Sequence, residues 1–144
     1  MTEQNRAIAR RWFHEVWNEG RRESIEELLA PDAVSHEGPR TSVGVAAFYP
    51  YFDRLHSTFT GMNLKVEQWI FEEDLATARW ACDVTHTGDG LGMPATNKPY
   101  KIYGITILRV SDGRIHEGWQ HWDMLSLLQE IGANAPARTY ITSA

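Results

Sequence analysis

The segment Trp119-Gln120-His121-Trp122-Asp123 carries the residue types that most directly suggest chemistry. Side chains alternate along a strand, so Trp119, His121 and Asp123 share a face if the strand stays regular to its end. A carboxylate and an imidazole held beside an aromatic ring can act as acid and base. Asp123 also stands where a strand gives way to a helix, which suits a plain N-cap. The pattern leaves both roles open.

Other polar residues stand at strand ends and on strand faces. His86 precedes a loop, His36 lies in a short extended piece, and Thr106 lies within a strand. The pattern allows each of them a purely structural role as well as a functional one. The spacing of His, Asp and Glu forms no compact ligand motif, and Cys82 is the single cysteine, so we expect no metal site and no disulfide within the chain.

Apolar spacing predicts helices in the first part of the chain. Within the first ~30 residues an apolar stripe with helical periodicity includes Trp12 and Trp17, and Gly20 suits a left-handed cap. Ser24 is expected to cap a second short helix. A third helix is expected from Val43 to about Phe59, with Pro50 producing a kink or a break.

The second part of the chain has the period of strands. Alternation predicts strands over 64–71, 75–87, 100–110 and 115–122, with a hairpin turn at 111–114 and a final helical segment over 124–131. Helices followed by antiparallel strands predict an α+β fold. A strongly curved sheet wrapped around the N-terminal helices would enclose a conical pocket.

Composition narrows the possible partners and the expected compartment. The formal charge is −5 and there is no basic patch, so nucleic-acid binding is not expected. The sequence has no apolar run that resembles a signal peptide or a membrane span, which predicts a cytoplasmic protein without membrane contact. We expect one domain over residues 1–132 and a C-terminal tail over 133–144.

The sequence resembles the SnoaL-like polyketide (ester) cyclases, within the broader group of nuclear transport factor 2 and ketosteroid isomerase. The segments that carry the resemblance follow the family order and cover most of the chain. They are residues 12–20, 28–36, 85–88, 92–98, 109–117 and 119–132.

The resemblance implies a cone-shaped α+β fold with a deep apolar pocket, which is usually a homodimer. It implies a cofactor-independent reaction, an intramolecular aldol-type cyclisation of a polyketide-like carbonyl ester, and Asp123 matches the family's acid/base aspartate. In the anthracycline cyclases a histidine accompanies that aspartate, and the matching residue here is Thr106. Threonine donates a hydrogen bond but cannot become cationic, so we expect His121 to compensate in part.

These expectations define an initial functional hypothesis. The protein is expected to be an enzyme acting on a small-molecule substrate, with Asp123 and His121 as catalytic residues. The remaining expected site residues orient the substrate or form the pocket wall. They are His36, His86, Trp17, Trp80, Met93, Thr106 and Trp119. The alternatives are a non-catalytic small-molecule-binding module and a hydrolase or isomerase that uses the same aspartate.

Overall fold

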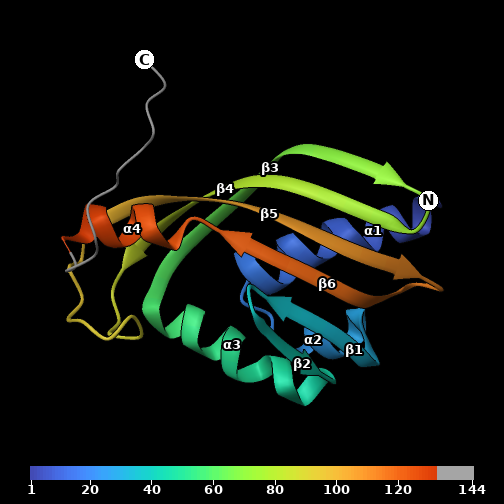
Figure 1. The fold of residues 1–144 in the computed structure, drawn as a ribbon, viewed down its shortest axis with the longest axis horizontal. Coiled ribbons are helices and arrows are strands. Elements are labelled where there is room, and N and C mark those ends of the chain that lie inside the picture. Colours follow the sequence, from blue (N-terminus) through green and yellow to red (C-terminus); the bar gives the residue numbers. More distant parts are fainter. Residues whose placement is uncertain (133–144) are drawn as a thin grey trace.

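A curved, open sheet of six strands forms the frame of the protein, and helices cover one of its faces (Figure 1). The computed structural model describes residues 1–132, and the expected tail at 133–144 lies outside them. The strand order is β2-β1-β6-β5-β4-β3. The strands are β1 (Leu29–Glu37), β2 (Arg40–Val43), β3 (Phe59–Glu72), β4 (Leu75–His86), β5 (Pro99–Ser111) and β6 (Arg114–Trp122).

Only the β1–β6 pair is parallel among the strand pairs of residues 1–132, so the sheet is mixed. The helices and this sheet confirm the predicted cone-shaped α+β fold. The four long strands lie where alternation predicts them. The β1–β2 hairpin was not predicted, because β2 is short and mostly polar. Gly38 and Pro39 form its turn.

The N-terminal helices lie beneath the sheet (Figure 1). α1 (Glu3–Arg11) continues into a π-helix, η1 (Trp12–Asn18), whose wider turns bury Trp12, Phe13, Val16 and Trp17. This confirms the predicted apolar stripe. His56 donates a hydrogen bond of 2.9 Å from Nε2 to the carbonyl oxygen of Val16, and so satisfies a backbone group near the end of η1.

One local prediction about the helices is wrong, and of the two outcomes expected at Pro50 the break does not occur. Ser24 does not cap α2 (Glu23–Leu28), because it lies inside the first turn, where its hydroxyl bonds to Glu15. Pro50 does not break α3 (Val45–Thr58), which runs through it. Both Pro50 and Ala46, whose carbonyl loses its helical donor, are exposed, so water can replace the missing bond.

The inner face of the sheet, which faces the helices, is closely packed. On β4, Ala78, Trp80 and Cys82 are buried, while Arg79 and Asp83 are exposed on the outer face. Gly104 of β5 pairs with Trp80, and a Cβ there would approach the Trp80 ring to 2.3 Å. Glycine is therefore required for the indole to lie across β5.

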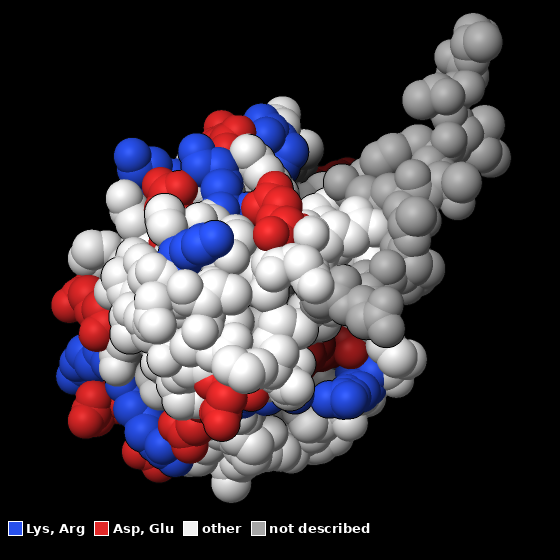
Figure 2. All heavy atoms as spheres, turned by 90° about the vertical axis from the view of Figure 1, so that its left-hand side faces the viewer, with Lys and Arg blue, Asp and Glu red and all other residues white. Residues whose placement is uncertain are grey.

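The last helix, α4 (Met124–Ile131), lies at the end of the sheet where β6 finishes (Figure 1). Viewed from this end, basic and acidic side chains are interspersed around the rim, and uncharged groups cover most of the centre (Figure 2). None of the helices within residues 1–132 has the length and apolar character needed to cross a membrane.

Candidate functional site

A cavity of about 600 Å³ lies between the inner face of the sheet, η1, α3 and the β1–β2 hairpin. Trp12, Trp17 and Phe48 line it with aromatic surface, and Leu29, Leu108 and Ile115 add aliphatic surface. Its polar lining side chains come from β1, β2, α3, β5 and β6. The cavity therefore offers an apolar body with polar groups at a few places, as small-molecule sites usually do.

Glu37 is the one carboxylate among the residues that line this cavity. Its Oε1 accepts a hydrogen bond of 3.3 Å from Arg54 on α3. Burial raises the pKa of the Glu37 carboxyl, and the charges of Arg54 and Arg40 offset this only in part. A carboxyl group with a raised pKa in a cavity is suited to proton transfer near neutral pH.

Tyr51 lies beside Glu37 and lines both this cavity and a smaller one of about 50 Å³. Its hydroxyl is buried. The Trp122 indole N–H can donate to its oxygen, but no group within residues 1–132 is placed to accept the hydroxyl proton. Burial and the Glu37 charge raise the pKa of the hydroxyl, so it remains protonated at neutral pH. A buried hydroxyl proton without an acceptor is costly, and a bound oxygen atom would accept it.

Thr106 is buried on the inner face of β5 and lines the cavity, as expected of a site residue. Its hydroxyl accepts a hydrogen bond of 3.0 Å from the Trp80 indole and donates a short one to Gln120 Oε1. These bonds fix the Gln120 carboxamide with its oxygen toward Thr106. The amide nitrogen of Gln120 makes no hydrogen bond within residues 1–132, so it can donate into the cavity.

His36 and Trp119 stack at the rim of the cavity, with ring centroids 5.4 Å apart. They pair across β1 and β6, and Nε2 of His36 lies 2.7 Å from Glu117 Oε2. Alternation places Glu37 and Gln120, the next residues on each strand, on the opposite, inner face. Sequence reasoning singled out His36 and missed its neighbour Glu37.

His121 and Asp123 lie away from the lining of the large cavity. His121 is exposed and pairs with Ile105, whose side chain lies on the outer face. β6 ends at Trp122, so strand alternation does not extend to Asp123. Asp123 is exposed and caps α4, where its carboxylate accepts bonds from the backbone N–H and the hydroxyl of Ser126.

The other expected site residues are spread over the core and a loop. Trp17 lines both cavities, while Trp80 lines the smaller one. His86 is fully buried, and its Nδ1 accepts a bond of 3.2 Å from the Thr96 N–H. Met93 is half-buried in the loop between β4 and β5 and does not line the large cavity. No group of three His, Cys, Asp or Glu side chains within 1–132 could hold a metal ion.

This fold and its cavity define a protein of the nuclear transport factor 2-like class. A sequence profile of the SnoaL-like polyketide cyclases matches residues 7–131, and the chain belongs to that family. No curated protein is significantly similar to the sequence.

Three solved structures illustrate the similarity. A proposed SnoaL-like polyketide cyclase from Jannaschia sp. CCS1 has 22% identity and a TM-score of 0.83, and the match covers 90% of this chain and 92% of that protein's chain. AclR, a proposed hydroxylase from Streptomyces galilaeus, has 21% identity and a TM-score of 0.81, covering 92% and 98%. IdmH, a proposed polyketide cyclase from Streptomyces antibioticus, has 27% identity and a TM-score of 0.77, covering 92% and 100%. The different activities proposed for AclR and IdmH illustrate that fold alone does not fix the reaction.

Proposed function

We propose that the protein catalyses cofactor-independent proton transfer on a polyketide-like carbonyl compound, leading to aldol-type ring closure. One observation carries this proposal. The large cavity brings a carboxyl group with a raised pKa, Glu37, next to the Tyr51 hydroxyl, whose proton has no acceptor within residues 1–132, and within an aromatic enclosure. Family membership supports the reaction class.

The reaction conserves all atoms. The Glu37 carboxylate removes a proton from a carbon next to a substrate carbonyl, and the electron pair moves into an enolate. Tyr51 and the amide nitrogen of Gln120 donate hydrogen bonds to the enolate oxygen as its charge develops. The enolate carbon then attacks a second carbonyl of the same molecule, forming the new carbon–carbon bond. The alkoxide produced takes the proton back from Glu37.

The assignment of the base differs from the expectation based on the family resemblance, which gives this role to Asp123. The Asp123 carboxylate accepts two hydrogen bonds from Ser126 as a helix cap, and Asp123 is not among the residues that line the large cavity. Glu37 accepts a single hydrogen bond within residues 1–132 and lines the cavity. We therefore assign the base to Glu37 and the cap to Asp123.

A reporter of proton abstraction tests this assignment without knowledge of the natural substrate. In 5-nitrobenzisoxazole, removal of one carbon-bound proton breaks the N–O bond and releases a coloured phenolate. We expect the native protein to accelerate this reaction and Glu37→Gln to lower the rate by about 10²–10⁴-fold. Asp123→Asn should leave it within about twofold, because asparagine also caps helices well.

Glu67→Gln is the matched control, because Glu67 pairs with Arg79 on the surface of β3. The Glu67→Gln variant should catalyse the reporter reaction at the rate of the native protein. A full rate in Glu37→Gln, together with a loss in Asp123→Asn, would return the role of base to Asp123. No acceleration by the native protein would contradict acid/base catalysis and favour a non-catalytic binding module.

A further inference from the structure

The lining of the large cavity carries more positive than negative formal charge, although the chain as a whole is acidic. Arg40 and Arg54 are the two Lys or Arg residues among the lining, and Glu37 is the one Asp or Glu. The formal charge of the whole chain is −5. This local excess of positive charge favours a ligand with an anionic group.

These two arginines form few ion pairs with carboxylates of the protein. The Arg40 side chain is exposed, and its guanidinium forms no hydrogen bond or ion pair within residues 1–132. Arg54 uses one of its five N–H donors, in the 3.3 Å bond to Glu37, and 40% of its side chain is exposed. Both guanidinium groups therefore retain donors for a ligand.

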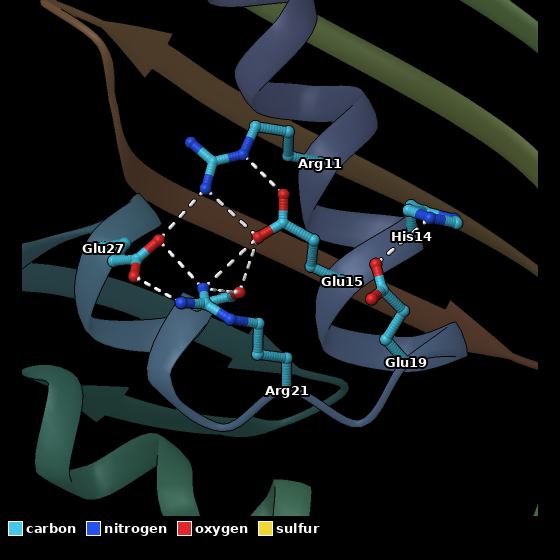
Figure 3. Close-up of polar contacts among 7 residues, drawn as sticks. Arg11, His14, Glu15, Glu19, Arg21 and Glu27 are labelled. Carbon is cyan, nitrogen blue, oxygen red and sulfur yellow. Dashed lines mark hydrogen bonds and ion pairs between the residues drawn. The ribbon is translucent and has the colours of Figure 1, made fainter.

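Arg11 of α1 and Arg21, which precedes α2, differ in this respect (Figure 3). Arg11 bonds to Glu15 and Glu27, and Arg21 makes two bonds of 2.9 Å to Glu27. These guanidinium groups are already occupied by protein carboxylates. The donors at the cavity are therefore not a general property of arginines in this protein.

The positions of the two arginines fit a substrate with one polar end. Arg40 begins β2 and pairs through its backbone with Glu37, while Arg54 approaches Glu37 from α3. The aromatic part of the cavity, formed by Trp12 and Trp17 among others, comes from η1. A ligand carboxylate bound by the arginines would leave its apolar body in this aromatic part.

We propose that Arg40 and Arg54 form a carboxylate subsite, and that the substrate is an aromatic or polycyclic keto acid with a free carboxylate. The fork of donors on a guanidinium matches the two oxygens of a carboxylate. This inference rests on the proposed function in using the same cavity, and it replaces the ester implied by the family resemblance with a free acid. A bound carboxylate competes with Glu37 for Arg54 and so releases the base from its ion pair.

Binding of two small probes tests the subsite separately from catalysis. Calorimetry would compare 2-naphthoate with methyl 2-naphthoate, which has the same ring system and no charge. We expect the acid to bind the native protein about tenfold or more tightly than the ester. Arg54→Gln and Arg40→Gln should each remove most of this preference and leave the affinity for the ester unchanged, which also shows that the cavity is intact.

Arg79→Gln is the matched control, because it removes the same charge from an arginine paired with Glu67 and Gln68. It should keep the preference for the acid. Equal binding of the two probes, no binding of either, or the same loss in Arg79→Gln would overturn the proposal. Glu37→Gln should still bind the acid, so a failed subsite and a failed base assignment give different results.

Discussion

The Trp80 indole donates a 3.0 Å hydrogen bond to the Thr106 hydroxyl, and this bond connects the core of the sheet to the cavity. Thr106 in turn donates to Gln120, which lines both cavities. The two bonds fix the orientation of the Gln120 carboxamide. Thr106, which stands where the anthracycline cyclases have a histidine, thus acts on the cavity indirectly, by orienting Gln120.

Replacing Thr106 with valine should destabilise the protein. The shape is conserved, but the buried Trp80 N–H and the Gln120 oxygen both lose their partner, which costs about 1–3 kcal/mol. Chemical denaturation followed by tryptophan fluorescence measures this change. Thr106→Ser keeps the hydroxyl and should lose clearly less stability. Equal losses in the two variants would show that packing of the methyl group, rather than the hydrogen bonds, sets the cost.

Glu15 should contribute stability that depends on pH. The bonded Arg11 guanidinium, chiefly, lowers the pKa of the Glu15 carboxyl to about 2 from its usual 4.5, against the effect of burial. A lowered pKa means that the contribution is complete above about 4.5 and is lost as the pH falls toward 2. We expect Glu15→Gln to cost about 1–2 kcal/mol at neutral pH, since Arg11 is partly exposed.

The free energy of unfolding of Glu15→Gln and of the native protein should therefore converge in acid. Denaturation series across this pH range measure the difference. Glu19 provides the control, because its only ion pair within residues 1–132 is with His14 and both side chains are largely exposed (Figure 3). Glu19→Gln should change stability very little at any pH. A difference between Glu15→Gln and the native protein that does not change with pH would contradict the assigned pKa.

Cys82 should resist alkylation in the folded protein. Burial raises the pKa of its thiol to about 12, and the side chain faces the core from the inner face of β4. The thiolate that reacts with iodoacetamide is therefore scarce and inaccessible at mildly alkaline pH. Labelling followed by mass spectrometry should be slow in buffer and rapid in denaturant. Rapid labelling of the folded protein would show that this part of the core opens readily.

Local patterns were sufficient to predict most of the fold. The alternation of buried and exposed residues from Leu75 to His86 is that of a half-buried strand, and the structure has β4 there. The π-helical turns of η1 were not predictable, because α- and π-helices bury a similar stripe of aromatic residues. The hydrogen bond from His56 to Val16 joins η1 to α3, and no pattern within η1 indicates it.

Only part of the candidate site was predictable from the sequence, because the rest depends on contacts between distant parts of the chain. Thr106 was found through the family comparison and lies in the cavity. Alternation states only that His36 and Glu37 point to opposite faces of β1. Which of them faces inward depends on the parallel register that pairs Glu37 with Gln120 of β6. That register is a contact between distant parts of the chain, so the carboxylate of the cavity could not be assigned from the sequence.

The pH dependence of catalysis should report on the ion pair between Glu37 and Arg54. A base acts in its ionised form, so the rate with 5-nitrobenzisoxazole should fall as the pH is lowered through the pKa of Glu37. Burial raises this pKa, and the Arg54 charge offsets part of the increase. Removing that charge in Arg54→Gln should therefore move the midpoint of the kcat/KM profile to higher pH.

The neutral reporter makes this measurement independent of carboxylate binding. Arg79→Gln removes a cation that is bonded to Glu67 and does not line the cavity. This variant should therefore keep the midpoint of the native protein. Asp123→Asn should likewise leave the midpoint unchanged if Asp123 acts only as the cap of α4. A midpoint that moves in Asp123→Asn and stays fixed in Arg54→Gln would identify Asp123 as the titrating base. Because the direction of each shift follows from a single charge, the profiles distinguish the two carboxylates.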